Sequence, residues 1–130
     1  KMKRIVAAMV EIGEVANEIR AFKFWSTKPR SSDDIIIEEL IDVLHFMLSL
    51  LNADNIAADE ADINAYKTGS FDNQIMGLYL SVANWDNLHW RSAVQYFLGL
   101  AEMLGFSGED LENAYRRKNE INYRRQEEGY

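Results

Sequence analysis

The chain has 130 residues, 48% of them apolar, so it is long enough for one domain with a sizeable core and too short for a two-domain enzyme. One proline, seven glycines and no cysteines argue against a many-stranded sheet and exclude disulfides and thiolate metal sites. A net charge of −7 argues against direct nucleic-acid binding, and the lack of a long apolar run argues against a membrane span or signal peptide, so a cytoplasmic protein is expected.

The segment from about Lys3 to Phe24 is expected to form an amphipathic helix. Its apolar residues recur at steps of three and four and predict one buried stripe: Ile5, Ala8, Met9, Ile12, Val15, Ala16, Ile19 and Phe22. Glu11, Glu14 and Glu18 fall along one side of this helix, within reach of a common ligand. Residues 26–32 are expected to form a connecting loop.

A second helix is expected from residue 33 to about residue 51, with Ser31 or Ser32 as its N-cap. It has almost no polar face, which predicts a central position surrounded by neighbours. Glu39 and Asp42 lie in this apolar helix. Carboxylates on a buried helix are costly unless they are paired or bind a metal, so these two are the most informative residues.

The second half of the chain is expected to add further helices to the same all-α domain, which spans residues 1–130. Residues 52–72 are irregular, with room for one short helix and no expected core chemistry. Three more helices are expected over residues 73–88, 90–104 and 109–127. Gly105 is expected to end the second of these, and Ser107 with Asp110 predicts a capping box for the third. The expected fold is a bundle of five to six helices.

Glu11 with Glu14, and Glu39 with Asp42, form two acid pairs, each at positions i and i+3. The short loop between their helices favours antiparallel neighbours, which brings both pairs to a similar height. Four convergent carboxylates suit Mg²⁺, with Mn²⁺ as a substitute. Glu11 and Glu14 alone could form an ordinary solvated helix face. Because Glu39 and Asp42 lie on a buried helix, a metal site becomes as good an interpretation of these acids as a solvated surface.

Several longer motifs contain these acids. They are Glu11-Ile-Gly-Glu14-Val-Ala-Asn-Glu18, Phe22-Lys23-Phe24-Trp25-Ser26, Glu38-Glu39-Leu-Ile-Asp42-Val-Leu-His45-Phe46, and a C-terminal series of Tyr115, Lys118-Asn119, Asn122, Arg125-Gln126 and Gly129-Tyr130. In this order they resemble the dimeric, all-α dUTPases, which belong with the MazG-like nucleoside triphosphate pyrophosphohydrolases. The resemblance covers roughly half of the chain and is weak between residues 52 and 104.

The resemblance implies a homodimeric, Mg²⁺-dependent dUTP diphosphatase that also cleaves dUDP. The matching metal and catalytic positions are Glu11, Glu14, Glu39 and Asp42. One glutamate of the cluster, Glu11 or Glu14, would act as the general base. Glu18, Glu38 and His45 are expected to lie behind these ligands and support them.

The same resemblance implies a set of substrate-binding residues. The matching positions are Trp25, Phe46, Lys118, Asn122, Arg125 and Tyr130. Trp25 and Phe46 would wall the base and deoxyribose pocket, although either could equally be an ordinary core residue. Asn122 would read the uracil edge, and the remaining three would contact phosphates. Without the resemblance, the polar face of the last helix could simply be solvated.

Other interpretations remain open at this stage. The site could act on another nucleotide such as dCTP, or the chain could be a phage-type dUTPase that mainly binds a regulatory protein partner. A ferritin-like di-iron protein is a weaker alternative, based on the Asp42/His45 and Asp86/His89 steps.

Two features bear on how complete the site is and how it assembles. Family members typically begin with a further helix that carries a base-binding glutamine, and this helix is apparently absent here, where the chain opens at Lys1. Trp85, Trp90, Tyr96 and Phe97 are candidates for a dimer interface or, alternatively, for the core.

Overall fold

The computed structural model describes residues 1–57 and 63–129, and this part of the chain contains helices and no strands. The helices are α1 (Met2–Ile19), α2 (Asp33–Ala53), α3 (Phe71–Ala83), α4 (Trp90–Met103) and α5 (Gly108–Glu127). Five helices in the described residues confirm the predicted all-α fold. None of them is both long and apolar enough to cross a membrane.

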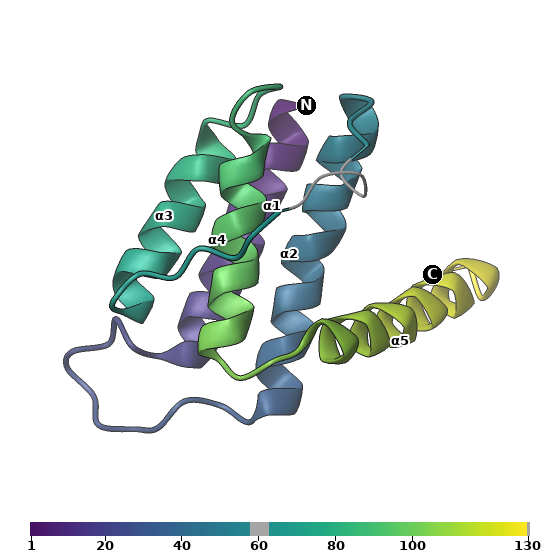
Figure 1. Ribbon diagram of the computed structural model, residues 1–130. Helices are drawn as coiled ribbons and strands as arrows, with labels where there is room; N and C mark the ends of the chain where they lie inside the picture. The colour runs from purple at the N-terminus through teal and green to yellow at the C-terminus, as the bar shows by residue number, and fades with distance from the viewer. Residues whose placement is uncertain (58–62, 130) are drawn as a thin grey trace.

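Helices α1 to α4 lie roughly alongside one another as a bundle, and α5 projects away from it (Figure 1). α1 packs against both α2 and α3, and α4 packs mainly against α3. The first part of α5 packs on α2 through the buried residues Leu111 and Ala114. The C-terminal part of α5 therefore extends beyond the bundle.

α1 ends at Ile19 and not, as expected, at Phe24. Arg20 adopts a left-handed conformation with φ of 67°, and its N–H donates to the carbonyl of Ala16, which closes the helix. The buried stripe of α1 is otherwise confirmed, with Met9 half-buried. Phe22 was wrongly assigned to it: beyond the helix end its side chain is 42% exposed.

The later helices match the expected elements with shifted ends. α3 begins two residues earlier and ends at Ala83, because residues 84–89 form a turn in which Asp86 accepts hydrogen bonds from the N–H groups of Leu88 and His89. The Ser107 capping box is confirmed, and Gly105 has a positive φ of 88° after α4. In the 52–72 segment the described residues after Ala53 contain no helix before α3. Residues 58–62 of this segment lie outside the described residues, so the expected short helix stays a prediction there.

The fully buried Gln74 pins the segment before α3 to α4. Its Nε2 donates to the carbonyls of Tyr66 (2.6 Å) and Tyr96 (2.9 Å), and its Oε1 accepts from the N–H of Thr68 (2.7 Å). Gly99 allows this approach, since a Cβ there would lie 1.8 Å from the Tyr66 carbonyl oxygen. The polar side chain in the core is thus fully partnered.

The aromatic residues of the second half belong mainly to the core. Trp85, Trp90 and Phe97 are 4%, 6% and 1% exposed. Tyr96 is partly buried against the same core. The core alternative therefore holds for these residues, and the three buried rings do not present an interface surface.

Candidate metal centre

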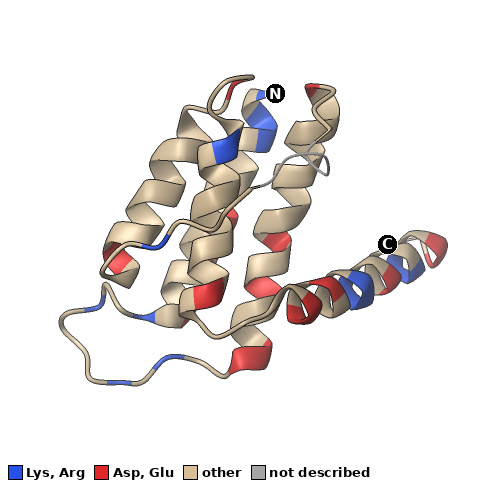
Figure 2. Ribbon diagram, viewed as in Figure 1, with Lys and Arg blue, Asp and Glu red and all other residues tan. Residues whose placement is uncertain are grey.

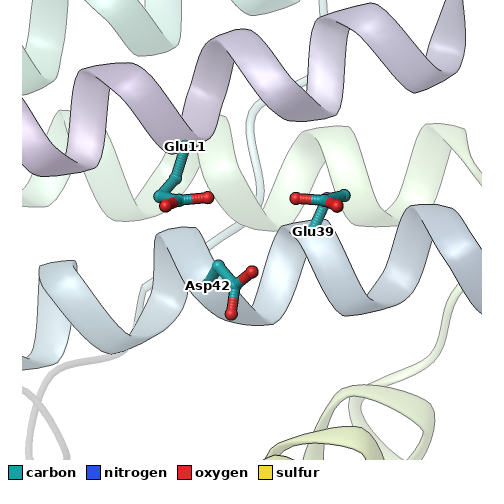
Figure 3. A group of neighbouring side chains, drawn as sticks. All are labelled: Glu11, Glu39 and Asp42. Carbon is teal, nitrogen blue, oxygen red and sulfur yellow. The ribbon is translucent and has the colours of Figure 1, made fainter.

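Three carboxylates meet in the space between α1 and α2. Glu11 projects from α1 and Glu39 from α2 into the space between the two helices, and Asp42 lies beside them on α2 (Figure 3). One oxygen from each can be chosen so that all three lie within 4.8 Å of one another, and all three side chains are partly buried. The expected convergence of the two acid pairs is therefore seen for these three residues, because the short 20–32 loop makes α1 and α2 adjacent.

The cluster is electrostatically unfavourable without a cation. Burial raises the pKa of the Glu11 carboxyl, and the charges of Asp42 and Glu14 raise it further. Burial likewise raises the pKa of Glu39, followed by the charges of Asp42 and Glu11. Like charges held this close favour either protonation or a bound cation. Three oxygen donors of this type fit Mg²⁺ or Mn²⁺, which take carboxylate ligands together with water and phosphate oxygens.

Lys118 of α5 faces the cluster. Its Nζ lies 3.3 Å from Oδ1 of Asp42, and both side chains are largely shielded from solvent. The Lys118 charge also lowers the pKa of Glu11. A cation carried by α5 therefore lies beside the carboxylate cluster.

The other acids of the motifs lie around the cluster. Glu14 is exposed on α1, outside the group of three, but near enough for its charge to raise the pKa of Glu11 and Glu39. Glu18 accepts a hydrogen bond from the hydroxyl of Ser31 and so ties the loop to α1. Ser32, not Ser31, is the N-cap of α2, and it forms no side-chain cap bond. Glu38 is exposed.

His45 lies one turn beyond Asp42 in α2. Its ring stacks on that of Tyr115, with 4.8 Å between centroids. Burial lowers the pKa of His45, and its Nε2 is buried without a hydrogen-bond partner among the described residues. His89, in contrast, is exposed in a turn and pairs with Asp86 at 2.9 Å. The second acid-to-histidine step is therefore not on a helix, which removes the di-iron pattern.

The two predicted aromatic residues of the pocket lie in different surroundings. Phe46 is partly buried and packs against the hydrophobic core of the bundle. Trp25 is 65% exposed in the loop after α1, where its ring contacts those of Phe22 (5.9 Å) and Phe24 (5.2 Å).

The C-terminal motif is brought to the cluster only in part. Lys118 reaches Asp42, whereas Asn122 lines a shallow hollow formed by residues 116–126 of α5 alone. Arg125 is exposed in the projecting part of the helix. Tyr130 lies outside the described residues. The reason is that α5 packs on α2 through its first turns and then leaves the bundle.

A polar contact that the sequence analysis did not predict joins α1 to α2 two turns along the helices from the cluster. Nε of Arg4 donates to the hydroxyl of Ser49 at 2.8 Å, linking α1 to α2. The signal was present in the spacing: Arg4 precedes Glu11 by seven residues, and Ser49 follows Asp42 by seven. Two turns separate each pair, so both lie on the same face as the cluster.

Comparisons with known proteins address the whole chain. A family model described as dUTPase matches residues 1–130. A search of curated proteins finds no match.

Proposed function

The chain belongs to the dUTPase family, and on that premise we propose that it hydrolyses dUTP to dUMP and pyrophosphate with divalent cations held by Glu11, Glu39 and Asp42. As a dUTPase it is a nucleoside triphosphate diphosphatase. The observation that carries the proposal is the convergence of these three carboxylates within 4.8 Å between α1 and α2. Mg²⁺ is the proposed metal, and Mn²⁺ the proposed substitute.

The chemistry divides between the cluster and its neighbours. When bound, divalent cations neutralise phosphate charge and lower the pKa of a coordinated water. Glu11, Glu39 and Asp42 would hold them beside the Lys118 ammonium. Glu14, which lies outside the group of three and whose charge raises the pKa of Glu11, is proposed as the general base or as a fourth metal ligand.

Lys118 is proposed to contact a phosphate oxygen of the substrate. Its ammonium already lies beside Asp42 and can turn towards a phosphate that approaches the same carboxylate. Asn122, Arg125 and Tyr130 are proposed to contact the nucleotide from the C-terminal part of the chain, and Trp25 and Phe46 to contact its sugar and base. We propose that the metal-binding carboxylates are held in position by Glu18, Glu38 and His45.

The proposed substrates are dUTP and dUDP, and a panel of triphosphates tests the first of them. Pyrophosphate release is measured from dUTP, dTTP, dCTP and UTP, with Mg²⁺ and with EDTA. Cleavage of dUTP that requires Mg²⁺ is expected. Cleavage of dCTP in preference to dUTP would contradict the proposal that dUTP is the substrate. If none of the four nucleotides is cleaved, the proposed hydrolysis is contradicted and the protein-binding alternative is favoured.

A homodimer in the cytoplasm is also proposed. Exposed apolar residues form a stripe on α1, where Val6 is 52% and Val10 is 58% exposed, and continue on the adjacent α3 with Met76 and Leu80. Burying such a surface against a second copy would be favourable. Sedimentation at micromolar concentration tests this for the wild-type chain and for the Val6→Glu and Val10→Glu variants. A wild-type mass equal to that of the monomer would contradict the dimer.

A further inference from the structure

Two contacts between α5 and α2 lie next to each other on both helices. The ring of Tyr115 on α5 stacks on that of His45 on α2, with 4.8 Å between centroids and 29° between the ring planes. Three residues further along α5, Nζ of Lys118 lies 3.3 Å from Oδ1 of Asp42, which precedes His45 by three residues in α2. Three residues advance a helix by about 4.5 Å, so the ring stack and the ion pair are neighbours within one interface.

The ion pair by itself is too weak to hold α5 in place. The side chains of Lys118 and Asp42 are 24% and 27% exposed. A partly exposed pair contributes little, and a lysine held in one geometry loses the freedom of a long side chain. Beyond Lys118 the described residues of α5 are mostly exposed, and both acidic and basic residues occur along this part of the helix (Figure 2). The direction of α5 is therefore set by residues that precede Lys118.

Three of these preceding residues pack against the bundle. Leu111 and Ala114 are 8% and 4% exposed and attach the first turns of α5. Tyr115 packs both on the hydrophobic core and on the His45 ring. Stacked rings prefer particular separations and plane angles, so this contact restricts the rotation and tilt of α5 just before Lys118. Nε2 of His45 has no hydrogen-bond partner among the described residues, so the stack, and not a hydrogen bond at that nitrogen, holds the histidine ring.

We propose that Tyr115 is a positioning residue, which by stacking on His45 holds the Lys118 ammonium beside Asp42. Through Lys118 it sets how tightly the carboxylate cluster binds a divalent cation and how the ammonium meets a phosphate of the substrate. The effect on phosphate rests on the proposed function, whereas the effect on the cation does not. The phenol hydroxyl is not required, because the stack uses the ring alone.

Manganese binding tests the proposal without turnover. Electron paramagnetic resonance measures the Kd of Mn²⁺ for the wild-type chain, Tyr115→Ala, Tyr115→Phe and Lys118→Gln. Tyr115→Ala should bind Mn²⁺ about two- to fivefold more tightly than the wild type, as Lys118→Gln should, because both remove a competing ion pair of this strength. Tyr115→Phe keeps the ring and should keep the wild-type Kd. Tyr123→Ala is the matched control, since Tyr123 is 64% exposed on the projecting part of α5, and it should also keep the wild-type Kd.

A double variant separates positioning from a general structural role. If Tyr115 acts through Lys118, adding Tyr115→Ala to Lys118→Gln should change neither the Kd of Mn²⁺ nor the rate of dUTP hydrolysis any further, because residues that act through one contact are not additive. Tyr115→Leu keeps an apolar side chain on α5 but loses the flat ring, and it should shift the Kd in the same direction as Tyr115→Ala. Circular dichroism of each variant confirms that the helices are retained.

Three results would overturn the inference. They are an unchanged Kd in Tyr115→Ala, a further change in the double variant, and a Tyr115→Phe variant that behaves as Tyr115→Ala, which would assign the effect to the hydroxyl. The proposed function fails separately. A chain that shows the Tyr115 and Lys118 effects on Mn²⁺ but cleaves no triphosphate would support the inference and contradict only the proposed function.

Discussion

Nζ of Lys118 lies 3.3 Å from Oδ1 of Asp42, so α5 contributes a positive charge to a cluster of carboxylates formed by α1 and α2. A bound divalent cation would compete with Lys118 for the same carboxylate. The contact therefore links metal binding to the placement of α5.

Replacing Lys118 with Gln should separate these two effects. Without the ammonium, the free protein should bind Mn²⁺ more tightly, because a competing cation is gone. Hydrolysis of dUTP should nevertheless fall by about tenfold or more, because a charged contact to phosphate is lost. Mn²⁺ titration followed by electron paramagnetic resonance measures the first effect and steady-state kinetics the second. Unchanged metal affinity would show that Lys118 does not compete at the cluster.

The thermal stability of the Glu39→Gln variant tests the metal assignment independently of activity. Saturating Mg²⁺ stabilises a protein that binds it, by about 2.7 kcal/mol at a hundred times the Kd, so the wild-type Tm should rise by several degrees. The variant should show little or no rise. Glu102→Gln is the matched control, because Glu102 forms an exposed pair with Lys67 away from the cluster and should retain the full shift. An equal shift in all three proteins would contradict the assignment.

The raised pKa values of Glu11 and Glu39 predict how stability depends on pH without metal. A carboxyl whose pKa is raised in the folded state binds protons more tightly when folded, so the free energy of unfolding falls as pH rises from about 4.5 through the raised values. In EDTA, Glu39→Gln should weaken this pH dependence and should be at least as stable as the wild type at pH 7. Urea denaturation between pH 4.5 and 7 measures both. A variant that is less stable than the wild type at pH 7 would contradict the repulsion between these acids.

The close approach at Gly99 predicts a large stability effect far from the cluster. An alanine Cβ there would lie 1.8 Å from the Tyr66 carbonyl oxygen and 2.6 Å from Nε2 of Gln74, so the pinned segment must move. Gly99→Ala should lower the free energy of unfolding by about 1–3 kcal/mol. Gly108→Ala provides the matched control, because no atom lies within 4 Å of a Cβ at that position. Urea denaturation of both variants checks the difference; equal stabilities would mean that the segment adjusts freely.

Much of the fold and part of the site follow from local patterns in the sequence. The period of apolar residues in α1 and the capping box at Ser107 are local signals, and both are confirmed. The convergence of Glu11 with Glu39 and Asp42 follows from two helices joined by a short loop. The apolar period continued through Phe22, and the sequence pattern did not indicate that Arg20 would end the helix with a left-handed backbone.

The rest depends on packing between distant segments. The direction in which α5 leaves the bundle decides that Lys118 meets Asp42 and that Asn122 lines a hollow on its own helix. The pairing of Arg4 with Ser49 depends on the register of α1 against α2. The exposed polar face of α5 could not predict where Lys118 and Asn122 lie, because a solvated helix has the same pattern.

The central claim is that Glu11, Glu39 and Asp42 hold the cations that support dUTP hydrolysis. The most direct test follows dUTP by ³¹P NMR in Mg²⁺ with the wild-type chain, Glu39→Gln and Glu102→Gln. The account predicts dUMP and pyrophosphate from the wild type and Glu102→Gln, and a loss of about a hundredfold or more in rate for Glu39→Gln, as for removal of a key electrostatic contact in catalysis. Equal rates for all three proteins, or hydrolysis that persists in EDTA, would contradict it.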